Sequence, residues 1–151
     1  MKVLGIGRTG ITVQNMERSL EFYVGVLGFK VIDPPCEMVE DQAESTAIGV
    51  PGCFHRICLL EVCDGQCIEL VEFDRAPSPI ACALPLNQLG QHHISYVIDD
   101  MEEWVAKFKD LKLGFFSEYM TSVISDGSTV RWLLVKDPDG VVIELIQKNV
   151  N

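Results

Sequence analysis

The chain has 151 residues, of which 48% are hydrophobic, so it can bury the core of one compact domain and is too apolar to be disordered. Its formal net charge of −10 disfavours binding to nucleic acids and anionic membranes, which both attract basic surfaces. No apolar run approaches the roughly 20 residues of a membrane span, and the first five residues are too short and too interrupted by glycine for a signal peptide. We therefore expect a cytoplasmic protein whose partner is a small molecule.

The first half of the chain predicts a β-α-β-β-β unit. Residues 8–14 carry β-branched side chains and are typical of a strand. Asn15 can cap a helix that begins at Met16, and Gly28 can end it in the left-handed conformation that glycine adopts easily. Three further strands complete the unit, the last two joined by a tight turn: they are residues 29–32, 57–63 and 66–73.

Residues 33–54 separate the second and third of these strands. They contain Pro34-Pro35, an acidic cluster and Pro51-Gly52, which together indicate an irregular excursion. The second half of the chain has no counterpart of equal length. Because long surface loops often carry binding residues, we expect this excursion to help shape a site.

The six cysteines form no Cys-x-x-Cys pair, and most of them lie among apolar residues typical of strands. This placement favours reduced, buried thiols. Cys63 and Cys67 flank the predicted turn and could approach each other, but a redox pair is the weaker interpretation.

A linker rich in proline, about residues 76–90, separates the first unit from a second with the same order of elements. A strand is predicted at residues 92–98, Asp99 or Asp100 can cap the next helix, and Gly114 ends it. The helix has an apolar face of Met101, Trp104, Val105, Phe108 and Leu111. The remaining strands are residues 115–119, 129–136 and 141–147.

The two halves are copies of one unit, as three sets of matching segments indicate. The matching pairs are residues 13–17 with 98–102, 27–29 with 113–115, and 64–70 with 139–145. The first offset places Arg8 opposite His93, and the last places Glu69 opposite Glu144. Four positions thus become candidates for one site.

The two glutamates carry the argument for a site. Alternate strand residues share a face, so Glu69 lies with Cys67 and Val71, on what we interpret as an apolar, core-like face. A carboxylate there is costly unless it is paired, protonated or bound to a metal, and imidazole and carboxylate both bind first-row metals. The alternative is that Glu69 and Glu144 face solvent and that His93 is an ordinary core histidine. The repeat symmetry favours a site, while His92 points to the opposite face and His55 matches no repeat position.

One motif points elsewhere. Residues 5–10 fit the G-x-G-x-x-G dinucleotide fingerprint, with Asp33 at a suitable distance for a ribose contact. The fingerprint requires a strand before the glycines and a helix that opens within them, whereas here a strand is predicted to follow. We therefore do not expect a nucleotide-binding fold.

The repeated segments resemble the vicinal oxygen chelate superfamily, which includes glyoxalase I, methylmalonyl-CoA epimerase, extradiol dioxygenases and bleomycin-resistance proteins. The resemblance is carried by residues 16–23 with 27–29, by His92-His93-Ile94, and by residues 137–140 leading to Ile143-Glu144-Leu145. It implies an α+β, glyoxalase-like fold in which two tandem βαβββ modules form a cup-shaped mixed sheet. Residues 1–151 would be a single domain, with module one at about 6–75 and module two at about 91–149.

The resemblance also implies a divalent metal, nickel, zinc, cobalt or manganese, held by the first and last strands of each module. The matching positions here are Arg8, Glu69, His93 and Glu144. The enzymes usually have a histidine where Arg8 stands, and a guanidinium has no lone pair to offer. Three outcomes stay open: metal binding by the other three residues, pairing of Arg8 with the carboxylates without metal, or binding of an anionic substrate group by Arg8.

The resemblance implies a lyase or isomerase like glyoxalase I and methylmalonyl-CoA epimerase, with the metal stabilising an enediolate and with Glu144 or Glu69 as the catalytic group that moves the proton. A metal-free binding or drug-sequestering protein of the bleomycin-resistance type is the alternative. A dioxygenase comes third, because its iron site needs a histidine where Arg8 stands. Modules of this superfamily pair within a chain or across a dimer, and we expect a homodimer.

Overall fold

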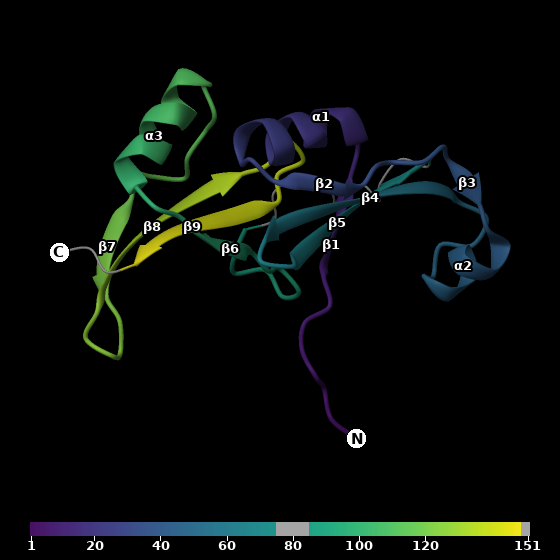
Figure 1. Ribbon diagram of the computed structural model, residues 1–151, viewed down its shortest axis with the longest axis horizontal. Coiled ribbons are helices and arrows are strands. Elements are labelled where there is room, and N and C mark those ends of the chain that lie inside the picture. The colour runs from purple at the N-terminus through teal and green to yellow at the C-terminus, as the bar shows by residue number, and fades with distance from the viewer. Residues whose placement is uncertain (75–84, 149–151) are drawn as a thin grey trace. The chain divides into compact units, whose positions relative to one another are not determined.

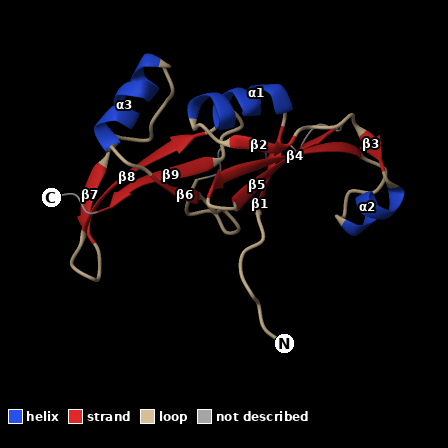
Figure 2. Cartoon of the chain, viewed as in Figure 1, coloured by secondary structure: helices blue, strands red, loops and turns tan. Residues whose placement is uncertain are grey.

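The computed structural model describes residues 1–74 and 85–148, and the chain divides into two compact units, residues 1–81 and 82–151. Most of the predicted linker, with Cys82, lies outside the described residues. Each unit contains one β-sheet with a helix packed against it (Figures 1 and 2), so the predicted α+β class is confirmed. None of the helices in the described ranges is long and apolar enough to cross a membrane.

Unit one is built on a sheet with the strand order β1-β5-β4-β2. The first strand runs parallel to β5, and the other pairs are antiparallel. The short strand β3 pairs with β4 outside this path. The strands are β1 (Thr9–Val13), β2 (Lys30–Asp33), β3 (Val39–Glu40), β4 (Phe54–Cys63) and β5 (Gln66–Phe73).

Unit two repeats this arrangement with the strand order β6-β9-β8-β7. Its first strand is again parallel to its last, and the remaining pairs are antiparallel. The strands are β6 (Ile94–Val97), β7 (Met120–Val123), β8 (Thr129–Lys136) and β9 (Val142–Lys148). The helix of this unit is α3 (Met101–Asp110), which begins at the predicted cap, Asp100, whose side chain accepts a bond from Glu103 N–H.

The strand register shows the repeat residue by residue. In unit one Gly10 lies opposite Glu69, and in unit two Ser95 lies opposite Glu144. These pairs have the same offsets as the repeated sequence segments. The two predicted glutamate positions are therefore equivalent places in two copies of one sheet.

The first turn of each helix is fixed to the last strand by equivalent hydrogen bonds. Met16 N–H donates to Glu72 Oε2 at 3.0 Å in unit one, and Met101 N–H donates to Gln147 Oε1 at 3.1 Å in unit two. These bonds satisfy backbone donors that a helix leaves unpaired at its N-terminus. Each helix is thereby held at a defined place on its sheet.

An arginine in β4 of unit one and an arginine in β8 of unit two reinforce the contact between helix and sheet. Arg56 pairs with Glu17 at 2.9 Å and with Glu72 at 2.7 Å, while Arg131 pairs with Glu102 at 2.6 Å. Burial acts to lower the pKa of Arg56, but the bonds to its two carboxylates outweigh this effect and raise the pKa above its ordinary value.

The core of each unit lies between the helix and one face of the sheet. Alternate residues of the last strand are buried there, Ile68 and Leu70 in unit one and Ile143 and Leu145 in unit two. Burial of each such side chain contributes roughly 1.5 to 3 kcal/mol. The helices add the large buried side chains Met16, Tyr23, Met101 and Phe108.

Several element boundaries differ from the prediction. The first helix is α-helical only over α1 (Met16–Leu20) and continues as a π-helical segment, η1 (Glu21–Val26), before Gly28 ends it at φ 81°. The prediction of a strand at residues 115–119 is wrong. Phe115 makes a single bridge to Val135, and the strand itself follows at β7, because cross-strand pairing rather than local pattern sets its position.

The excursion at residues 33–54 is more ordered than predicted. It contains β3 and a short helix, α2 (Gln42–Ala47), capped by Asp41, which accepts a bond from Glu44 N–H. The sequence carried this signal, since an aspartate three residues before a glutamate is a helix-start pattern. Buried His55 lies next to this helix, 3.4 Å from Glu44.

The cysteines only partly follow the prediction of buried thiols. Cys53 and Cys58 are buried, and burial raises the pKa of the Cys58 thiol. Cys63 and Cys36 are exposed and Cys67 is intermediate, because the turn and the excursion lie outside the core. All five are free thiols, so Cys63 and Cys67 form no disulfide in this structure.

Candidate functional site

Glu69 lies in β5 on the sheet face that turns away from the helix. It shares that face with Cys67 and Val71, as predicted, but the buried face is the other one, which carries Ile68 and Leu70. The prediction of a core-like setting is therefore wrong in detail. The Glu69 side chain keeps 16% of its surface exposed, and strands β1 and β4 flank it on either side.

Arg8 precedes β1 and forms an ion pair with Glu69. The distance from Arg8 Nε to Glu69 Oε2 is 2.8 Å, and the arginine side chain is 57% exposed. This pair joins the two positions that the repeat assigns to one site. Its free energy is modest because so much of the arginine is in solvent.

Glu144 occupies the equivalent place in β9, on the face opposite Ile143 and Leu145. Its carboxylate has two neighbours from the β6 segment. The Ser95 hydroxyl donates a hydrogen bond to Oε2, and His93 Nε2 lies 3.5 Å from the same oxygen. The side chains of Glu144 and His93 are 18% and 41% exposed, so an incoming small molecule can reach both.

The donors of unit two fit a first-row metal in part. Two ligands about 2.1 Å from one ion, at angles between 90° and 109°, lie roughly 3.0 to 3.4 Å apart. The 3.5 Å separation of His93 Nε2 and Glu144 Oε2 is close to that value. Residues 1–74 and 85–148 contain no ready-made group of three such ligands, and Arg8 engages Glu69.

Ser95 is a further residue of the candidate site, and the sequence alone did not single it out. It lies two residues after His93 and therefore on the same strand face, opposite Glu144. Its counterpart Gly10 has no side chain to offer to Glu69. The sequence carried a signal for it, namely a polar residue two positions after a predicted ligand and therefore on the same strand face.

His92 and the glycines of residues 5–10 contribute to neither the Arg8–Glu69 pair nor the His93–Glu144 pair. His92 is exposed, and its carbonyl oxygen accepts a bond from the Gln91 side chain. Gly5 and Gly7 precede strand β1 and Gly10 lies within it, so no helix opens among these glycines. The structural context of a dinucleotide fingerprint is therefore missing, as the sequence predicted.

Comparison with known proteins identifies the family. The profile of the Glyoxalase/Bleomycin resistance protein/Dioxygenase superfamily matches residues 5–145, nearly the whole chain. The chain belongs to this superfamily. The predicted resemblance is thereby confirmed, and the matched region contains Arg8, Glu69, His93 and Glu144.

Two curated relatives of this superfamily member differ in activity. The chain is 28% identical over 142 residues to catechol-2,3-dioxygenase of Bacillus subtilis, covering 93% of this chain and 40% of that protein. It is also 28% identical over 144 residues to the mitochondrial methylmalonyl-CoA epimerase of Bos taurus, covering 94% of this chain and 73% of that protein. The chain thus spans less than half the length of the dioxygenase.

The solved structures confirm the glyoxalase-like fold. A glyoxalase family protein from Bacillus cereus superimposes with a TM-score of 0.79 at 20% identity, covering 99% of this chain and 97% of that one. At that level of identity the similarity concerns the fold alone. The superfamily fold supports many chemistries, so the activity has to be argued from the site.

Proposed function

We propose that this protein is a lyase or isomerase of the glyoxalase and methylmalonyl-CoA epimerase kind, which uses a divalent metal to stabilise an enediolate. Glu69, His93 and Glu144 would hold the ion, nickel, zinc, cobalt or manganese. When bound, it would act as a Lewis acid toward two adjacent substrate oxygens. The observation that carries this proposal is the approach of His93 to Glu144 on an accessible face of the second sheet.

Glu144 is the residue that we propose moves the proton. Both of its contacts with described residues use Oε2, so Oε1 remains for a proton from the substrate carbon. The Ser95 hydroxyl restrains the carboxylate, which favours one orientation toward the substrate. Glu69 is less suited to this role because the Arg8 guanidinium already engages its carboxylate.

The arginine also supports a second candidate function. A metal has to compete with the Arg8 guanidinium for Glu69, and arginine itself cannot act as a ligand. A metal-free protein that binds or sequesters a small molecule, as in bleomycin resistance, would keep this ion pair intact. The dioxygenase alternative is weaker because its iron triad needs a second histidine.

Calorimetric titration of the purified full chain with nickel, zinc, cobalt and manganese separates the two functions. The enzyme proposal expects saturable binding of at least one ion near one equivalent per chain. Elemental analysis of the protein as purified is the companion measurement. Absence of saturable binding for all four ions would reject the metal-dependent proposal and favour the binding protein.

A further inference from the structure

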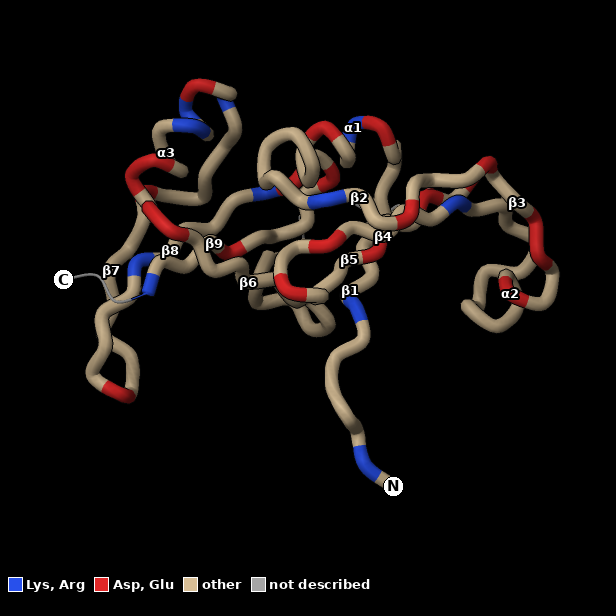
Figure 3. The backbone as a smooth tube through the Cα atoms, viewed as in Figure 1, with Lys and Arg blue, Asp and Glu red and all other residues tan. Residues whose placement is uncertain are grey.

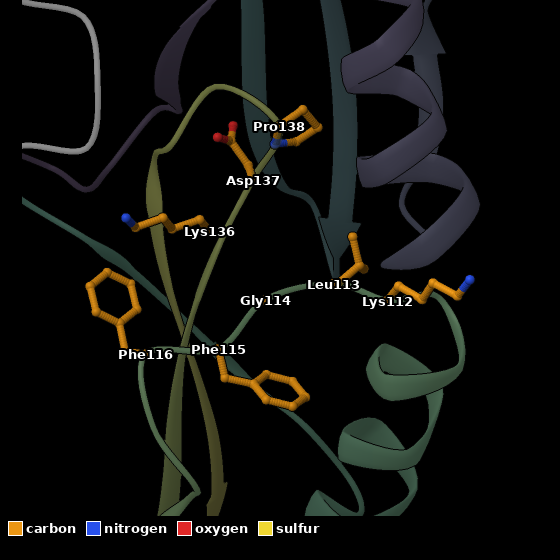
Figure 4. Close-up of a pocket in the computed structure, with 8 residues that line it drawn as sticks. All are labelled: Lys112, Leu113, Gly114, Phe115, Phe116, Lys136, Asp137 and Pro138. Atoms are coloured by element: carbon orange, nitrogen blue, oxygen red, sulfur yellow. The ribbon is translucent and has the colours of Figure 1, made fainter.

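A cavity of about 530 Å³ lies in unit two, next to the turn between β8 and β9. Its size is within the range of small-molecule sites. Figure 4 shows it between the segment that follows α3 and the end of β8. The lining residues are Lys112, Leu113, Gly114, Phe115, Phe116, Lys136, Asp137 and Pro138.

Part of this cavity is on the same sheet face as Glu144. Phe115 bridges to Val135, and both side chains are on the helix side, where Phe115 stacks on Phe108. Lys136 is the next residue of β8 after Val135 and therefore points to the opposite face, and Phe116 holds its ring against the Lys136 ammonium group. Phe116 and Lys136 therefore lie on the open face that carries Glu144.

Lys136 and Phe116 form a cation-π pair on this face. Lys136 Nζ lies 4.8 Å from the centre of the Phe116 ring, and Figure 4 shows both side chains together at one end of the cavity. No carboxylate in the described part of the chain pairs with Lys136, although acidic residues outnumber basic ones by 22 to 12 in the sequence. Figure 3 shows where the two kinds of charged residue lie along the backbone. Its positive charge is thus free to meet an anion.

The other charged lining residues have different roles. The Asp137 carboxylate is buried and accepts bonds from the backbone N–H groups of Asp139 and Val141, so it is committed to the turn. The Lys112 ammonium group points away from Lys136 and Phe116 in Figure 4. Among the charged residues that line the cavity, Lys136 is therefore the one that can bind an anionic group beside Phe116.

We propose that Lys136 and Phe116 form a subsite for an anionic group carried on an aromatic or apolar body. This inference rests on the proposed function and deepens it: the substrate is an organic acid or a phosphate ester. Leu134 pairs with Glu144, and Lys136 lies two residues further along β8. Strand geometry then puts the Cα atoms of Lys136 and Glu144 about 8 Å apart, so one small molecule can contact both.

Binding of small aromatic probes tests the subsite without any metal. Phenylacetate, phenyl phosphate and neutral phenylacetamide are titrated into ¹⁵N-labelled full chain and followed by NMR. We expect at least one anion to bind more tightly than phenylacetamide and to shift the amides of residues 113–116. Tighter binding of phenyl phosphate would identify phosphate esters as the ligand class of the subsite, and tighter binding of phenylacetate would identify carboxylates.

The matched variants are Lys136→Gln and Lys112→Gln, which remove one positive charge each from the same cavity. We expect Lys136→Gln to weaken binding of the preferred anion about tenfold, the loss of one charge-assisted hydrogen bond, and Lys112→Gln to weaken it less than about twofold. Phe116→Leu should weaken it about threefold through the lost ring contact. Equal effects of the two lysine variants, or equal binding of phenylacetate, phenyl phosphate and phenylacetamide, would overturn the proposal.

One further variant separates this inference from the proposed function. His93→Ala removes a proposed metal ligand but no cavity residue, so anion binding should persist within about twofold. If the wild-type protein binds the anion but none of the four metal ions, the proposed function is rejected and the subsite stands. Metal binding without any preference for the anionic probes would reject the subsite alone.

Discussion

The two units share a scaffold and differ at the site. In both, an arginine of β4 or β8 forms an ion pair with a glutamate at the start of the helix. A side chain of the last strand also accepts a hydrogen bond from the first helical N–H. At the open face the equivalence ends. Unit one presents Arg8 with Glu69 beside a glycine, whereas unit two presents His93 with Glu144 beside Ser95.

This contrast shows which contacts the fold requires and which are free to change. The anchoring contacts link helix to sheet, so their loss would affect the packing of a whole unit. The side chains of Arg8 and His93 on the open face are 57% and 41% exposed, so we expect changes at these two positions to cost little stability. In unit one the glutamate is paired with arginine, which cannot bind a metal, whereas unit two has a histidine that can act as a metal ligand.

The largest effect is expected from substitution of His93, with the adjacent His92 as the control. His93→Ala removes an imidazole that lies 3.5 Å from Glu144, so nickel affinity measured by calorimetry should fall at least about 100-fold. His92→Ala is the control and should change affinity less than about twofold. Equal losses in the two variants would show that unit two does not hold the metal through His93.

The anchoring arginines should differ in their contribution to stability. Arg56→Ala leaves Glu72, which is only 13% exposed, without its cation and should lower the free energy of unfolding by about 2 kcal/mol. Arg131→Ala affects Glu102, which is 52% exposed, and should cost about 1 kcal/mol or less. Urea unfolding of both variants measures the difference, and a larger loss for Arg131→Ala would contradict this reasoning.

Substitution at Arg8 tests whether the Arg8–Glu69 ion pair accounts for the expected difference in metal binding between unit one and unit two. Arg8→His frees Glu69 and supplies a nitrogen ligand, so nickel should bind about tenfold more tightly, or about 1.4 kcal/mol. Arg8→Gln is the matched control, because it removes the ion pair without adding a ligand. If the two variants bind nickel equally, the added imidazole does not reach the metal.

The smallest effects concern the residues opposite the glutamates. Ser95→Ala should weaken nickel binding about threefold, because Glu144 loses the hydrogen bond that orients it. Gly10→Ser makes the reciprocal change in unit one. A Cβ at Gly10 would meet no atom within 4 Å, so the free energy of unfolding should stay within about 0.5 kcal/mol. A large destabilisation by Gly10→Ser would show that the two faces are less equivalent than their register indicates.

The sequence determined the repeat and the pairing of its candidate residues. Strand and helix periodicities are local, and equal offsets between two copies imply equal places in two sheets. The offsets alone therefore match Arg8 to His93 and Glu69 to Glu144. The caps at Asn15 and Asp100 followed from short-range hydrogen bonding and are present.

Only the tertiary structure decided which face of each strand is buried, where β7 pairs, and that Arg8 closes on Glu69 while Ser95 supports Glu144. Alternation along a strand separates two faces but does not say which one a helix will cover. That choice, and every contact between residues far apart in the chain, depends on long-range packing that no local pattern encodes.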